Sequence, residues 1–112
     1  MIPIARPSIG QEELEIINEV FQKRWLGTGE KTVEFENKLK EILNIKNVIA
    51  VNSGTSALHI SLEAYGVGPG DNVLVPSLTN PSVIQVVLAT KAELNFCDVQ
   101  EKNINLDPED LE

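Results

Sequence analysis

Residues that bind metals or form disulfides are scarce in this sequence. Among 112 residues, Cys97 is the one cysteine and His59 the one histidine. A single thiol cannot form an internal disulfide, and no second histidine or cysteine stands at ligand spacing from His59. Cys97 lies in an apolar run without a catalytic motif, which is typical of a buried strand residue. Neither a disulfide framework nor a metal centre is therefore expected.

Long apolar runs and positive charges are also few. No stretch of about 18 apolar residues occurs, so no membrane span is expected. Nine Lys and Arg residues stand against 17 Asp and Glu residues, a net charge of −8. This balance argues against a nucleic-acid surface, which requires a basic face. The first residues show no apolar signal-peptide segment, and with the lack of disulfides this predicts a cytoplasmic protein.

The residues that are present fit one soluble α/β domain at most. Hydrophobic residues make up 42% of the chain and charged residues 23%. Residues 1–9 are expected to be extended. Apolar periodicity and turn residues predict helices over 11–24, 30–43, 55–65 and 82–91 and strands over 47–51, 72–75 and 93–97. The order β-α-β-α-β after two N-terminal helices predicts parallel strands.

One turn stands out because it could bind a phosphate. The apolar residues Val48 to Val51 are followed by Asn52-Ser53-Gly54-Thr55-Ser56 and a helical pattern. A strand that turns into a helix N-terminus directs unpaired N–H groups at an anion, and Gly54 permits close approach. The hydroxyls of Thr55 and Ser56 could also donate. The alternative is an ordinary connection in which Ser53 or Thr55 only caps the helix.

The last residues resemble the beginning of a helix rather than an end. Asp107 is a typical cap, Pro108 suits the first helical position, and acidic residues follow in the first turn. A helix of so few residues does not hold itself together. We therefore expect this chain to be the first part of a longer protein.

Short stretches along the whole chain form an ordered series. They are Ile2-Pro3, Arg6-Pro7-Ser8, Trp25-Leu26-Gly27-Thr28-Gly29, Phe35-Glu36, Ala50 to Leu58, Gly66-Val67-Gly68-Pro69-Gly70-Asp71, Val75-Pro76-Ser77 with Thr79, and Asn105-Leu106-Asp107-Pro108. Each stretch alone is a weak signal, but their order is specific. The series resembles the DegT/DnrJ/EryC1/StrS family of sugar aminotransferases, which use pyridoxal phosphate and have the fold-type-I aminotransferase fold.

The resemblance implies a role for each of three loops. The turn of Ser53, Gly54 and Thr55 would hold the cofactor phosphate. Gly27 and Thr28 would lie in a loop that approaches the substrate.

Thr79 and Asn80 would lie in the loop over the cofactor ring. Most members carry an aromatic residue at the position of Asn80, which stacks on the cofactor ring. Asparagine would stack more weakly there, by about 1 kcal/mol. Lys91 stands where glycine is usual, and we interpret it as a structural residue near a helix C-terminus.

The resemblance also implies what this chain lacks. Transamination requires a Schiff-base lysine and an aspartate paired with the pyridine nitrogen. In the family both lie downstream of the region present here, so no catalytic residue is assigned and the chain alone is expected to be inactive. The helices at about 11–43 would precede the start of the cofactor-binding large domain at about 47–112. In this partial sheet the strand 47–51 would lack its neighbours, whereas 72–75 and 93–97 could still pair. We therefore expect a fragment that is marginally stable, self-associated or rearranged.

Three functions remain open from the sequence. The first is the N-terminal portion of a dimeric aminotransferase that acts on a nucleotide-linked keto-sugar with glutamate as amino donor. The second is a non-catalytic module that binds phosphate or pyridoxal phosphate. The third is a structural fragment that needs a complementing chain.

Overall fold

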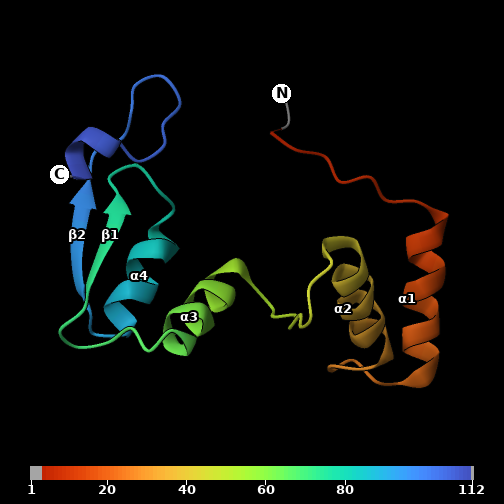
Figure 1. The fold of residues 1–112 in the computed structure, drawn as a ribbon. Helices are drawn as coiled ribbons and strands as arrows, with labels where there is room; N and C mark the ends of the chain where they lie inside the picture. Colours follow the sequence, from red (N-terminus) through yellow and green to blue (C-terminus); the bar gives the residue numbers. More distant parts are fainter. Residues whose placement is uncertain (1–3, 112) are drawn as a thin grey trace. The chain divides into compact units, whose positions relative to one another are not determined.

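The computed structural model describes residues 4–111, and the chain divides into two compact units, with the boundary between Ala50 and Val51. Predictions that concern residues 1–3 and 112, including the Ile2-Pro3 stretch, lie outside the described residues. Residues 5–10 belong to no helix or strand. No helix in the described part is both long and apolar enough to span a membrane. Figure 1 follows each unit along the chain.

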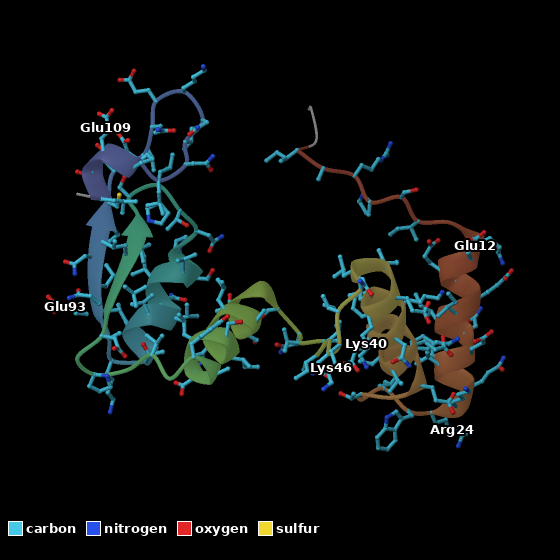
Figure 2. The ribbon with its side chains drawn as sticks, viewed as in Figure 1. Glu12, Arg24, Lys40, Lys46, Glu93 and Glu109 are labelled. Carbon is cyan, nitrogen blue, oxygen red and sulfur yellow. The ribbon has the colours of Figure 1, made fainter. Side chains whose placement is uncertain are left out.

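The first unit is a pair of helices, α1 (Gln11–Lys23) and α2 (Glu30–Leu43). Leu14, Ile17 and Phe21 form an apolar stripe along α1, but each remains about half exposed, and neither helix contains a buried residue. An ion pair links the helices, with Lys31 Nζ 3.2 Å from a carboxylate oxygen of Glu19. Exposed pairs of this kind contribute only about 0–1 kcal/mol. Charged side chains such as Glu12 and Arg24 extend from the surface of this unit (Figure 2).

The second unit contains helix α3 (Gly54–Ala64), strand β1 (Asn72–Pro76), helix α4 (Pro81–Ala89), strand β2 (Glu93–Cys97) and a short 3₁₀ helix η1 (Pro108–Leu111). The two strands pair in parallel, with Asn72 opposite Glu93 and Pro76 opposite Cys97. Helix α4 packs on the sheet and α3 packs on α4 (Figure 1). The predicted α/β class, the pairing of the last two strands and the incomplete sheet are confirmed.

The core of the second unit is small and centres on valines from different elements. Val75 of β1, Val87 of α4 and Ala92 are 1%, 2% and 7% exposed and form one cluster. The other face of the sheet is open, since Leu74 is about half exposed. Glu93 at the start of β2 points into solvent (Figure 2). What little core this unit has therefore lies between the sheet and the helices.

The strand predicted at 47–51 does not form. Residues 47–51 have no regular secondary structure, and no strand pairs with them in the described part of the chain. A strand satisfies its backbone groups only through a neighbour, so local β propensity is not sufficient here. The N–H of Ala50 instead donates to a carboxylate oxygen of Glu36 at 2.8 Å. The sequence-based prediction of a third strand was wrong for this chain.

Lys91 adopts a left-handed backbone conformation, with φ 62°, directly after the C-cap of α4. Its N–H donates to the carbonyl of Leu88 at 3.1 Å, which ends the helix. Glycine adopts this conformation without a steric cost, whereas a residue with a β-carbon is destabilised in it by about 1–2 kcal/mol. This explains why glycine suits the position.

The substitution Lys91→Gly is therefore expected to stabilise the second unit by about 1 kcal/mol. Urea unfolding, followed by the reaction of the Cys97 thiol, measures the change. Lys102→Gly is the control, because Lys102 is exposed and has no positive φ. Glycine there only loosens the unfolded chain, so this variant should be no more stable than the unsubstituted protein. Equal effects of the two variants would contradict the prediction.

Candidate functional site

The turn before α3 is built by a helix cap. Ser53 is the N-cap of α3, and its Oγ accepts the N–H of Ser56 at 3.1 Å. The carbonyl of Ser53 accepts the N–H of Ala57 at 3.1 Å and so begins the helical hydrogen bonds. The capping role that the sequence left open for this turn therefore belongs to Ser53. A cap of this type contributes about 1 kcal/mol and fixes the direction of the first helical N–H groups.

A chain of side-chain hydrogen bonds occupies the neighbouring hydroxyls. Ser56 Oγ donates to Asn52 Oδ1 at 2.8 Å, and Ser53 Oγ lies 2.9 Å from Ser56 Oγ. Because the single proton of Ser56 goes to Asn52, Ser53 is the donor in the second contact. The Ser56 hydroxyl, which the sequence suggested as a possible donor to an anion, is thus engaged within the turn in this structure. The role of Asn52 was missed, although its spacing of four residues from Ser56 is the available signal.

Three donors remain at the turn. The N–H groups of Gly54 and Thr55 and the hydroxyl of Thr55 make no hydrogen bond to any residue between 4 and 111. A β-carbon built on Gly54 would meet no atom within 4 Å, so the space in front of its backbone is open. Two N–H groups and a hydroxyl at a helix N-terminus match the acceptor oxygens of a phosphate. The donor set thus fits a phosphate group.

The loop after β1 holds the other two predicted cofactor residues. Thr79 is half-buried, and Asn80 is exposed with an extended backbone. Asn80 is the N-cap of α4, where its Oδ1 accepts the N–H of Ser82 at 3.0 Å. Pro81 follows at the first helical position. The Asn80 side chain therefore has a structural task within the loop, while its Nδ2 donor stays available.

The predicted substrate loop lies in the first unit and is organised by Trp25. The indole Nε1 donates to the carbonyl of Thr28 at 2.9 Å. A β-carbon on Gly29 would lie 2.9 Å from Trp25 Cδ1, closer than real side chains approach. On Gly27 the nearest atom would be Trp25 Nε1 at 3.6 Å, an ordinary contact. A side chain at position 29 would therefore have to displace the indole, whereas position 27 has room.

A hollow of about 310 Å³ opens beside this loop, wholly within the first unit. Its charged groups are already paired, because Lys23 contacts Glu30 and Lys31 contacts Glu19 and Glu34. The hydrogen bond from Lys23 lowers the pKa of Glu30, and the hydrogen bonds to Glu19 and Glu34 raise the pKa of Lys31. The hollow is lined by Glu19, Val20, Lys23, Trp25, Gly27, Gly29, Glu30, Lys31 and Thr32.

The substitution Gly29→Ala is expected to displace the Trp25 indole and break its hydrogen bond to Thr28, at a cost of about 1 kcal/mol. Trp25 is the only tryptophan of the chain, so its emission and its quenching by iodide report this change alone. Gly27→Ala is the matched control and should leave both signals unchanged. Unaltered emission in the Gly29→Ala variant would show that the Trp25 indole is not packed against Gly29.

Cys97 and His59 show no arrangement for catalysis. Cys97 is 2% exposed, and burial raises the pKa of its thiol, which keeps it in the protonated, unreactive form. His59 lies 3.6 Å from Glu63 on the surface of α3. No group of three or more His, Cys, Asp and Glu side chains among residues 4–111 is arranged to hold a metal ion.

The sequence profile of the DegT/DnrJ/EryC1/StrS aminotransferase family matches residues 7–112. The chain belongs to this family. The match contains the turn at Ser53–Thr55, the loop at Thr79 and Asn80 and the loop at Gly27 and Thr28. The resemblance found in the sequence is confirmed.

Two relatives from bacteria have similar sequences. The chain is 38% identical over 111 residues to the spore coat polysaccharide biosynthesis protein SpsC of Bacillus subtilis, with 99% of this chain covered. It is 36% identical over 107 residues to a dTDP-4-dehydro-2,3,6-trideoxy-D-glucose 4-aminotransferase of Saccharopolyspora spinosa, with 94% covered. The chain spans only 28% of the length of each of these relatives.

Solved structures of related aminotransferases share the fold of the chain. Spr1654 of Streptococcus pneumoniae, named as a sugar aminotransferase and solved in PLP and PMP forms, matches with a TM-score of 0.90 and 31% identity over 98% of this chain. The aminotransferase TlmJ of Streptoalloteichus hindustanus matches with a TM-score of 0.87 and 36% identity over 97%. The chain covers 28% and 30% of these two structures.

Proposed function

We propose that this chain is part of a pyridoxal-phosphate-dependent aminotransferase that acts on a nucleotide-linked keto-sugar. Membership of the family supports the reaction class. The name of the Saccharopolyspora spinosa relative, which specifies a dTDP-linked keto-sugar, supports the substrate class. Glutamate as amino donor, a homodimer and a cytoplasmic location complete the proposal.

The unpaired donors at Gly54 and Thr55 are the observation that carries the cofactor assignment. We assign their N–H groups and the Thr55 hydroxyl to the cofactor phosphate, with Ser53 holding the turn in place as the helix cap. A hydrogen bond to a charged group contributes about 1.5–3 kcal/mol, so three such donors provide substantial affinity. Thr79 and Asn80 are assigned to the ring of the cofactor, and Gly27 and Thr28 to the substrate.

Pyridoxal phosphate supplies the electron sink for the bond changes of amine transfer. The resemblance to the family implies a Schiff-base lysine downstream of the residues present here. We therefore assign that lysine, and the aspartate that pairs with the pyridine nitrogen, to parts of the polypeptide beyond this sequence. In this proposal the 112 residues bind and orient the phosphate and do not catalyse amine transfer alone.

Titration with pyridoxamine phosphate tests the phosphate site. This form of the cofactor lacks an aldehyde, so it does not react with surface lysines. We expect saturable binding, measured by calorimetry, that inorganic phosphate competes away and that pyridoxamine without phosphate does not reproduce. If inorganic phosphate does not weaken the binding of pyridoxamine phosphate, the turn at Ser53–Thr55 is not the phosphate site.

A second candidate, a binding module without catalysis, is favoured by Asn80. Its Oδ1 is engaged in capping α4 at 3.0 Å, at a position where an aromatic side chain would stack on the ring. Assays of amine transfer and of cofactor binding on the longest natural polypeptide that contains this sequence distinguish the two candidates. Transfer of the amino group of glutamate to a nucleotide-linked keto-sugar supports the enzyme. Phosphate-dependent cofactor binding without transfer supports the module.

A further inference from the structure

Asn52, the residue before the cap of α3, sets the direction of the hydrogen bonds in the turn. Its Oδ1 accepts the hydroxyl proton of Ser56 at 2.8 Å, and an amide oxygen has no proton to give in return. Ser53 must then donate its own proton to Ser56 Oγ, 2.9 Å away. All three residues belong to the second unit, so the network depends on that unit alone.

The acceptor on Asn52 also protects the helix cap. Ser53 Oγ accepts the N–H of Ser56 at 3.1 Å. Without Asn52, the nearest acceptor for the Ser56 hydroxyl would be the same Ser53 Oγ. The hydroxyl and the N–H of Ser56 would then compete for one oxygen, and the proton of Ser53 would lose its partner. Asn52 therefore keeps the cap in the one arrangement in which every hydroxyl proton is used.

The segment that carries the free donors is tied at both ends by this network. Asn52 and Ser53 lie before it and Ser56 after it, so Gly54 and Thr55 are enclosed between the tied residues. Glycine has more backbone freedom than any other residue. The N–H of Gly54 makes no hydrogen bond to residues 4–111 that could restrict it. The ties therefore act at the point where the backbone most needs restraint.

We propose that Asn52 is a positioning residue for the N–H groups of Gly54 and Thr55. This inference rests on the proposed function of the turn. A loose turn would lose backbone freedom when its donors close on a phosphate, and this loss weakens binding. The bond from Ser56 to Asn52 removes part of that freedom before the ligand arrives. Asn52 thus raises phosphate affinity through Ser56, without contact with the ligand.

Two variants of Asn52 and one control test this role in the complete 112-residue chain. Asn52→Ala removes the acceptor, whereas Asn52→Asp keeps an acceptor oxygen in the same place. Asn105→Ala is the matched control, because Asn105 is exposed in the same unit and its side chain makes no hydrogen bond to residues 4–111. Relaxation of the ¹⁵N-labelled amides of Gly54 and Thr55 gives order parameters, which measure the rigidity of the turn. Calorimetric titration with pyridoxamine phosphate measures the site.

We expect Asn52→Ala to lower the order parameters of Gly54 and Thr55 and to weaken pyridoxamine phosphate binding by about fivefold. Asn52→Asp should restore the order parameters but not the affinity, because its negative charge repels the phosphate. Asn105→Ala should change neither quantity. Asn52 is exposed and lies outside the buried cluster of the second unit, so these variants should leave the core intact.

A double-mutant cycle with Ser56→Ala tests whether Asn52 acts through Ser56. If it does, the variant that combines Asn52→Ala with Ser56→Ala binds pyridoxamine phosphate no more weakly than Ser56→Ala alone. Losses that add would mean that Asn52 acts on the ligand independently of Ser56, and the positioning role would be overturned.

Two further results would overturn the inference. Lower order parameters with unchanged pyridoxamine phosphate affinity would leave Asn52 with a structural role only, and the proposed function would stand. If the unsubstituted chain shows no phosphate-dependent binding, the proposed function fails and the positioning role fails with it. The titration of the unsubstituted chain distinguishes these two cases.

Discussion

The substitution Gly54→Ala is expected to weaken pyridoxamine phosphate binding by at least about tenfold, which is about 1.4 kcal/mol, while the fold becomes slightly more stable. The two effects have opposite signs because they have different causes. A β-carbon at position 54 meets no protein atom within 4 Å, so the folded chain accommodates it. The same methyl group occupies the space through which an anion would reach the Gly54 and Thr55 N–H groups.

The stability gain follows from the backbone of Gly54. It is the first residue of α3 and has no positive φ. Alanine at such a position reduces the freedom of the unfolded chain and stabilises by about 0.4–1 kcal/mol. Calorimetric titration and urea unfolding of the same sample measure both quantities. A lower stability would instead indicate that the variant acts through damage to the fold.

Gly68→Ala is the matched control for this experiment. Gly68 lies in the same unit and has no positive φ, and its nearest atom to an added β-carbon is the carbonyl oxygen of Thr90 at 3.8 Å. Alanine is therefore tolerated there without any change at the turn. Unchanged affinity in both variants would show that the turn at Ser53–Thr55 is not the phosphate site.

Local signals in the sequence predicted much of the fold. The bounds of α2, Glu30–Leu43, and of β2, Glu93–Cys97, are the predicted ones. Gly29 before α2 and the turn residues around β2 determine these bounds within a few positions. The prediction of a strand at 47–51 was wrong because strand formation does not depend on local signals alone. A strand depends on a partner that is distant in sequence, and the apolar residues Val48 to Val51 carry no information about whether that partner is present.

At the candidate site the sequence predicted the position of the turn but not its hydrogen bonds. The glycine and the helix signal placed the turn at Ser53–Thr55, because both act locally. Which hydroxyl remains free depends on side-chain rotamers: the sequence suggested both Thr55 and Ser56, whereas in the structure Ser56 donates to Asn52 and Thr55 has the free hydroxyl. The bond from Ala50 to Glu36 spans 14 residues, so no local pattern could reveal it.

The substitution Val87→Ala is expected to destabilise the second unit by about 2–3 kcal/mol, enough to unfold most of a marginal domain. Val87 is 2% exposed and packs against Val75 and Ala92 in a cluster of only three buried residues. The two lost methyl groups leave a cavity that few neighbours can fill. Leu88→Ala on the same helix is the control, because Leu88 is 58% exposed and should cost little.

Two single residues report on the two units separately. Cys97, the only cysteine, is buried in the second unit, so its reaction with a thiol reagent rises when that unit opens. Trp25, the only tryptophan, lies in the first unit, whose described residues contribute nothing to the Val75–Val87–Ala92 cluster. Val87→Ala should therefore expose the thiol and leave the tryptophan emission unchanged. Simultaneous loss of both signals would mean that the first unit, which has no buried helix residue, depends on the second for its stability.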